Sequence, residues 1–212
     1  MVILPIRTDV HKVYGPPQGR WTLADWEKLP ADDNRYEIID GVLYMSTAPS
    51  YFHQWISMRL SILVAGPTHE RGLAFCVASP VSVIMPGCDP VQPDFVVVHA
   101  EQKGIIQQKR VVGVPDVIVE ILSPGNRDFD EEIKLNAYAK AGVPEYAIID
   151  PAAHSFKLYR LRLKYIGQYV APKVFPGEQN ISFQLLSGIS FRVNQLFDGA
   201  PDTTLSIGDG FL

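Results

Sequence analysis

The stretch DVIVEILSPGNRDFDEEIKLNAYAKAGVPEYAIID, residues 116–150, decides the fold of this chain. Its first part, 116–122, is an apolar run rich in β-branched residues, which is typical of a strand buried on both faces. Turn-forming residues at 123–126 end that strand, and 129–141 has the pattern of a helix followed by glycine. A second buried strand follows at 146–149. Such a strand, helix and strand in succession predict an α/β domain in which the helix returns over the sheet.

The rest of the chain adds strands and one further long helix. Asp40 and Gly41 predict a two-residue hairpin, because both positions of such a turn need positive φ. A helix is expected to begin after Ser50 and to end at Gly66-Pro67. Further strands are expected at 36–39, 42–45, 73–77, 81–85 and 95–98, and a hairpin or meander at 156–169. We expect one mixed α/β domain spanning 1–212, with a core at about 22–197 and flexible ends.

Composition and charge exclude several classes of protein. The chain has 212 residues, of which 47% are hydrophobic and 20% charged, as in ordinary globular domains. Its net charge of −4 argues against a general nucleic-acid coat, although a local basic patch stays possible. No secretory signal and no apolar run of about 20 residues are present, so we expect a cytoplasmic protein without membrane association. The sequence also lacks the P-loop, serine-hydrolase and zinc-protease motifs.

Two carboxylates stand out because of where they lie. Glu120 falls within the apolar run 116–122, where an ionised carboxylate costs several kcal/mol unless a cation or hydrogen bonds compensate it. Asp94 follows a proline and opens the apolar run 95–98. The alternatives are an exposed edge position or an ion pair for Glu120, and a turn residue for Asp94. Two carboxylates at the ends of adjacent strands can share a divalent cation, and oxygen ligands suit Mg²⁺ or Mn²⁺.

Lys134 lies early in the helix that follows the Glu120 strand, so it can overhang the end of that strand. It shares a helix face with Asp130 and Tyr138, and an exposed surface cluster is the alternative interpretation. Glu37 is a further candidate, as a metal ligand or water-positioning base, or else as the polar face of an antiparallel strand. His53 is interpreted as a partly buried core histidine rather than a phosphate contact.

A basic stretch offers a candidate nucleic-acid surface. Arg160, Arg162 and Lys164 share one face of a predicted strand, while apolar residues take the other face. The preferred interpretation is a solvated strand face, and the functional alternative is contact with a nucleic-acid backbone.

Several of these segments, in this order, resemble a known family. The sequence is similar to the Uma-type restriction endonucleases, a bacterial family within the PD-(D/E)xK superfamily. The segments that carry the resemblance are YEIIDG at 36–41, QPD at 92–94, VEILSP at 119–124, KLNAY at 134–138, GVPEY at 142–146 and DP at 150–151. The resemblance implies a restriction-endonuclease-like fold, a central mixed β-sheet flanked by helices.

The same resemblance implies site residues and an activity. It implies that Glu37, Asp94 and Glu120 form the acidic set and that Lys134 is the catalytic lysine. The superfamily pattern would put lysine two residues after Glu120, where this chain has Leu122, so the lysine comes instead from the following helix.

The expected function is that of a Mg²⁺- or Mn²⁺-dependent endonuclease acting on DNA. We expect a homodimer, because cutting both strands generally needs two sites. The alternatives are a non-catalytic homodimeric binding module with the same fold and a hydrolase of small phosphoesters.

Overall fold

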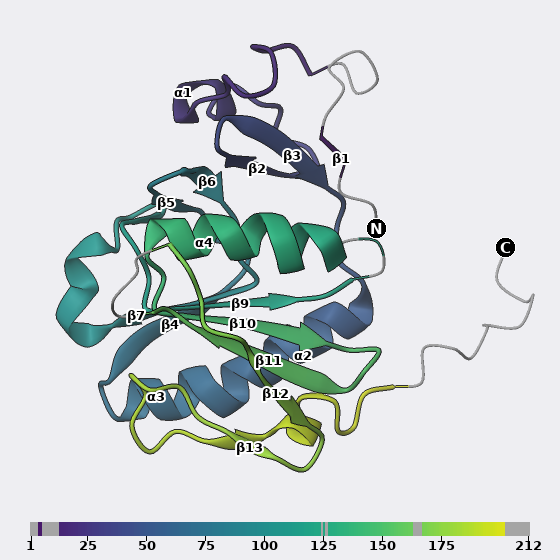
Figure 1. The fold of residues 1–212 in the computed structure, drawn as a ribbon, viewed down its shortest axis with the longest axis vertical. Coiled ribbons are helices and arrows are strands. Elements are labelled where there is room, and N and C mark those ends of the chain that lie inside the picture. Colours follow the sequence, from purple (N-terminus) through teal and green to yellow (C-terminus); the bar gives the residue numbers. More distant parts are fainter. Residues whose placement is uncertain (1–3, 6–12, 124, 126, 163–166, 202–212) are drawn as a thin grey trace, which may run out of the picture.

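The computed structural model describes residues 4–5, 13–123, 125, 127–162 and 167–201. Within these residues the chain forms two mixed six-stranded sheets and a small two-stranded hairpin, with helices packed on the sheets (Figure 1). The expected mixed α/β fold flanked by helices is therefore confirmed, but the strands divide between two sheets instead of joining one central sheet.

The first sheet comes mainly from the N-terminal half of the chain. Its hairpin turns at Asp40 and Gly41, which have φ of 48° and 74°, so the predicted turn with positive φ at both positions is confirmed. Neighbouring strands are antiparallel except for one parallel pair at the edge. In spatial order the strands are β1 (Leu4–Pro5), β3 (Val42–Ser46), β2 (Arg35–Ile39), β6 (Cys88–Val91), β5 (Val83–Met85) and β8 (Val111–Val112).

The second sheet has at its centre the two strands that lie within residues 116–150. These two strands, β9 and β10, are parallel to each other and buried along their whole length, as the sequence predicts. All other neighbours in this sheet are antiparallel. In spatial order the strands are β12 (Lys173–Pro176), β11 (Ser155–Arg160), β10 (Glu145–Asp150), β9 (Val117–Ile121), β7 (Phe95–His99) and β4 (Ala74–Ala78).

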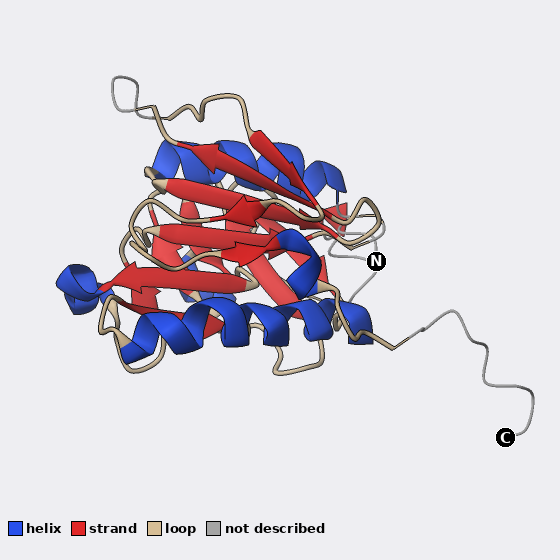
Figure 2. Cartoon of the chain, turned by 90° about the horizontal axis from the view of Figure 1, so that it is seen from below, coloured by secondary structure: helices blue, strands red, loops and turns tan. Residues whose placement is uncertain are grey.

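Helices cover both faces of the second sheet (Figures 1 and 2). One layer is a continuous helical segment made of α2 (Tyr51–Leu60), the π-helical η1 (Ser61–Ala65) and α3 (Gly66–Glu70). The opposite layer is the π-helical η3 (Phe129–Lys134) followed by α4 (Leu135–Ala141), which ends at Gly142 with φ of 96°. The remaining short elements are α1 (Leu23–Trp26), η2 (Ala100–Ile105), β13 (Asn180–Ile181), β14 (Phe191–Arg192) and η4 (Val193–Leu196).

The prediction that the helix after Ser50 ends at Gly66-Pro67 is wrong. The helical segment continues to Glu70, with Pro67 in the first turn of α3. The wider π-helical turn before it, in which Gly66 N–H donates to the carbonyl of Ser61, lets the chain pass a proline that has no N–H to donate.

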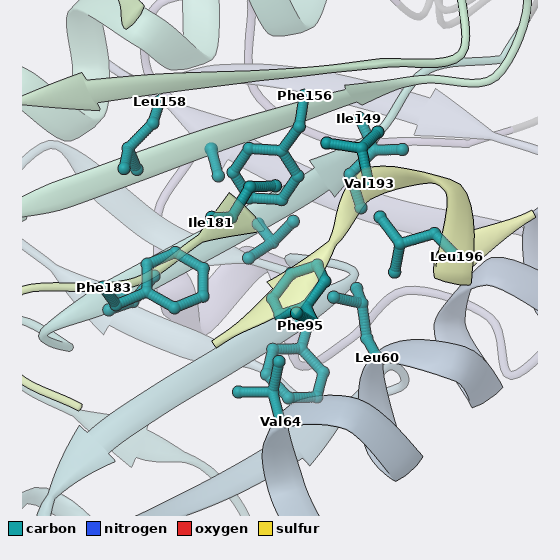
Figure 3. Close-up of a cluster of buried hydrophobic side chains, with 14 of the residues drawn as sticks. Leu60, Val64, Phe95, Ile149, Phe156, Leu158, Ile181, Phe183, Val193 and Leu196 are labelled. Atoms are coloured by element: carbon teal, nitrogen blue, oxygen red, sulfur yellow. The ribbon is translucent and has the colours of Figure 1, made fainter. Parts of the chain in front are cut away.

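The main hydrophobic core lies between the second sheet and the α2 layer (Figure 3). Alternate residues of β9 divide between this core and a second one on the opposite face, because successive side chains of a strand point to opposite faces. The C-terminal segment also contributes to the main core, through residues that include Ile181, Phe183, Val193 and Leu196. None of the helices in the described part of the chain is long and apolar enough to cross a bilayer.

Leu60→Ala tests how this core is built. Leu60 of α2 is 0% exposed, so truncation should lower the free energy of unfolding by about 2–5 kcal/mol, measured by urea denaturation. Met58→Ala in the same helix is the control, since Met58 is 43% exposed and its loss should change stability by less than about 0.5 kcal/mol. Equal losses for both variants would contradict the packing of α2 against the second sheet.

Candidate active site

Asp94 and Glu120 lie side by side where two neighbouring strands of the second sheet, β7 and β9, begin and end. Glu120 is the penultimate residue of β9, and Asp94 immediately precedes β7. Because β7 and β9 are antiparallel, the start of one meets the end of the other. The Ile121 amide donates to Asp94 Oδ2 at 2.9 Å, and the Asp94 amide donates to Glu120 Oε2 at 3.4 Å. Both side chains are buried, so neither is the exposed turn or edge residue of the alternative interpretation.

Lys134 is the last residue of η3, and its side chain reaches the two carboxylates. Its Nζ lies 2.9 Å from Glu120 Oε1, 3.1 Å from Glu37 Oε1 and 3.8 Å from Asp130 Oδ1. The residue is only 2% exposed, so the alternative of an exposed surface cluster is wrong. The helix that follows β9 does return over the sheet and place its lysine above the end of the strand.

Glu37 is the contribution of the first sheet. It lies on β2, is 2% exposed, and its Oε1 accepts both the Gln92 amide at 2.8 Å and the Lys134 ammonium. The interpretation of Glu37 as the solvated face of an antiparallel strand is therefore wrong. The amide of Gln92, which precedes Asp94 by two residues, fixes the Glu37 carboxylate beside the lysine.

Two further basic side chains contact Asp94. Arg35 Nη1 lies 3.0 Å from Asp94 Oδ1, and His53 Nε2 lies 2.9 Å from Asp94 Oδ2. Arg35 is held in place by Ser79 Oγ at 2.7 Å. His53 is buried, as expected of a core histidine, but its partner is a carboxylate of the site. Arg35 was not predicted, although it lies two residues before Glu37 and hence on the same strand face.

Tyr138 and Asp130 complete the cluster. The Tyr138 hydroxyl donates to Glu120 Oε1 at 2.9 Å, from the helix turn after Lys134. Asp130 is 4% exposed and lies one turn before Lys134. The site therefore gathers four buried carboxylates around two permanent cations, Lys134 and Arg35.

Burial and charge act on these groups in opposite directions. Burial raises the pKa of Glu120 well above its usual value, although Lys134 opposes the shift. Burial also raises the pKa of Asp130 to about 7, again against the attraction of Lys134. For Asp94, burial raises the pKa, but the hydrogen bond and charge of His53, together with Arg35 and Lys134, outweigh burial and lower the pKa below its usual value.

The Lys134 ammonium is held in its charged form. Burial lowers its pKa, but Glu120, Glu37 and Asp130 more than reverse this effect, so the net shift is upward. The surroundings thus favour the charged forms of Asp94 and Lys134 and the neutral forms of Glu120 and Asp130.

Asp94 and Glu120 are the carboxylates that could hold a hard divalent cation. A space of about 20 Å³ lies among the side chains, enough for one water-sized occupant. In the described residues no group of three or more His, Cys, Asp or Glu side chains is placed to hold a metal ion. Mg²⁺ commonly takes only one or two carboxylates, so Asp94 and Glu120 could hold it without a third. Such an ion would share the carboxylate oxygens of Asp94 and Glu120 with Arg35, His53 and Lys134.

The predicted basic strand face lies away from this cluster. β11 ends at Arg160, whose Nε lies 2.9 Å from Oε1 of the buried Glu145. Arg160 stands opposite Glu145, which is offset from the Glu120 position by three residues, about 10 Å along the strands at 3.3 Å per residue, and Arg160 lies two strands across the sheet from Glu120. Arg162 is exposed beyond the strand, and Lys164 lies outside the described residues. Nucleic-acid contact by these residues stays a prediction.

Comparisons with known proteins agree with this architecture. A crystal structure of "a putative nuclease belonging to DUF820" from Anabaena variabilis is similar, with a TM-score of 0.69 and 19% sequence identity. The match covers 83% of this chain and 97% of that chain, and at this identity it shows the fold alone. No curated protein matches the chain significantly. The sequence profile of the Uma2 family, described as "Putative restriction endonuclease", matches residues 23–194. The chain belongs to the Uma2 family.

Proposed function

We propose that this protein is a metal-dependent nuclease that hydrolyses phosphodiester bonds in DNA. The observation that carries the proposal is a buried lysine surrounded by carboxylates from separate segments of the chain, Glu37, Asp130 and Glu120, with Asp94 beside them. The description of the Uma2 family and the nuclease of similar fold support the same reaction class.

The cluster holds more charged groups than a simple structural ion pair. Burying a charged group costs several kcal/mol, and a structural ion pair offsets that cost with one partner for each charge. Here four buried carboxylates share two permanent cations, and burial raises the pKa of two of these carboxylates, Glu120 and Asp130, in spite of the cations. An additional divalent cation, Mg²⁺ or Mn²⁺ held by Asp94 and Glu120, would stabilise the ionised form of Glu120.

Four residues of the cluster, besides the two carboxylates proposed to hold the metal ion, have a task in phosphodiester hydrolysis. Lys134, beside Glu120, would stabilise the negative charge that develops on the phosphoryl oxygens. Glu37, fixed by the Gln92 amide, would hold the ammonium in position. Arg35 and His53 would orient the Asp94 carboxylate. When bound, the metal ion would polarise the phosphoryl oxygen and lower the pKa of its bound water.

DNA as the substrate follows the restriction-endonuclease description of the family. Cleavage of both strands would require two such sites, so the active form is proposed to be a homodimer with two-fold symmetry.

Site variants should separate catalysis from folding. Asp94→Asn, Glu120→Gln and Lys134→Met should each reduce nicking of supercoiled plasmid in Mg²⁺ or Mn²⁺ by at least about 10²-fold, the scale of losing one preorganised electrostatic group. Lys134→Met keeps the length of the side chain, and circular dichroism should report a folded protein for all three variants.

Two exposed residues of the same helical segment provide matched controls. Glu132→Gln and Lys140→Met remove the same charges as the site variants but lie on the surface, so both should nick like the wild type. Wild-type nicking by a folded Asp94, Glu120 or Lys134 variant would remove that residue from the mechanism. If the wild type nicks no plasmid but hydrolyses a small phosphoester, the protein is a hydrolase of small phosphoesters. If it hydrolyses neither substrate, it is a non-catalytic binding module.

The basic residues Arg160 and Arg162 are proposed to contact the DNA backbone. Arg162→Ala should weaken DNA binding and reduce the slope of log affinity against log salt by about 0.9, one phosphate contact, without changing the melting temperature. Arg160→Ala should in addition lower the melting temperature, because Glu145, which is 1% exposed, loses its partner cation. An unchanged affinity and salt slope in both variants would return these residues to a solvated or purely structural role.

A further inference from the structure

A cavity of about 510 Å³ adjoins the carboxylate cluster. It lies where α2 begins and where β9 and β10 end, and its lining shares His53 and Ser123 with the space among the carboxylates. Its size is that of a pocket for a small organic ligand. The catalytic roles proposed above use none of the other residues that line it.

The end of this cavity next to the cluster carries polar atoms without partners. His53 is 7% exposed and uses Nε2 for Asp94, while its Nδ1 has no hydrogen-bond partner among the described residues. Ser123 Oγ, in the same part of the chain that the structure describes, is also without a partner. Both atoms need a ligand or solvent to complete their hydrogen bonding.

The N-terminus of α2 lines the same part of the cavity. Ser50 caps this helix, and its Oγ accepts the amide of His53 at 3.2 Å. The amides of Tyr51 and Phe52, in the first turn, have no acceptor within the helix. Amides without a helical acceptor and the positive end of a helix of 10 residues suit an anion such as phosphate. Nδ1 of His53 can donate to the same anion when the imidazole is doubly protonated.

The rest of the cavity is mainly apolar. Phe52, Leu122, Pro151 and Ala152 line it and offer surfaces on which a planar nucleobase can pack. Its charged residues neutralise each other, because Arg127 Nη2 lies 2.6 Å from Asp150 Oδ2. Asp150 is further satisfied by the amides of Ala152 and Ala153, so it presents little uncompensated charge to an anionic ligand.

We infer that this cavity binds one unstacked deoxynucleotide of the substrate. Its phosphate would lie at the start of α2, next to His53 and Ser123, and its base against Phe52 and Ala152. The position beside the scissile phosphodiester rests on the proposed nuclease function, whereas nucleotide binding itself does not. A nucleotide drawn out of the helical stack favours DNA that is unpaired or distorted at the cleavage point, where unstacking costs least.

The experiment is calorimetric titration of the full chain with deoxyadenosine monophosphate in the presence of chelator. The nucleotide should bind with one-to-one stoichiometry, and deoxyadenosine or inorganic phosphate alone should bind at least about tenfold more weakly, the factor of one good polar contact. Ala152→Trp should fill the cavity and weaken nucleotide binding at least about tenfold. Ala153→Trp is the matched control, an exposed neighbour in the same turn that does not line the cavity, and should bind like the wild type.

A second variant tests the phosphate end of the cavity. His53→Ala should weaken binding of the nucleotide but leave binding of deoxyadenosine unchanged. The inference is overturned if the nucleotide fails to bind the wild type, or if Ala152→Trp binds it as well as Ala153→Trp. A wild type that nicks plasmid but binds no nucleotide would contradict nucleotide binding in the cavity and leave the nuclease function standing. A wild type that binds the nucleotide but nicks no plasmid would contradict the nuclease function and leave nucleotide binding in the cavity standing.

Discussion

The ammonium group of Lys134 lies between carboxylates that belong to different sheets. Glu37 comes from the first sheet and Glu120 from the second, and the ammonium is 3.1 Å from one and 2.9 Å from the other. Removing one charge from such a buried group leaves the others uncompensated, at a cost of about 3–5 kcal/mol. The same ion pairs that join the sheets therefore fix the geometry of the candidate active site, and the site inherits the rigidity of the strands that carry it.

Around this lysine the charges are distributed unevenly. Asp94 has Arg35 and His53 as partners and stays ionised, whereas burial pushes the pKa of Glu120 upward. The site thus offers one carboxylate whose charged form its neighbours stabilise and one whose charge a further cation would stabilise. Beside it lies the cavity at the start of α2, which shares His53 and Ser123 with the site, so the proposed phosphoryl chemistry and the proposed nucleotide binding would take place side by side.

The sequence predicts those parts of the site that follow from local pattern. An acidic residue in a doubly buried strand, and a lysine in the helix that returns over it, identify Glu120 and Lys134. Arg35 and His53 could not be found in this way, because they meet Asp94 across 59 and 41 residues. The division into two sheets depends likewise on distant strand pairing, and the helix passes Pro67 only because a π-helical turn replaces the regular pattern.

The central claim, that the carboxylate cluster holds a divalent cation, is tested most directly by thermal unfolding with and without metal. An ion that binds only the folded chain at a hundredfold excess over its Kd adds about 2.7 kcal/mol. For a chain of this size that corresponds to a rise in Tm of about 5–10 °C. We expect Mg²⁺ or Mn²⁺ to produce this rise over chelator in the wild type and in Glu132→Gln, but not in Asp94→Asn. The same Tm for the wild type in metal and in chelator would contradict the account.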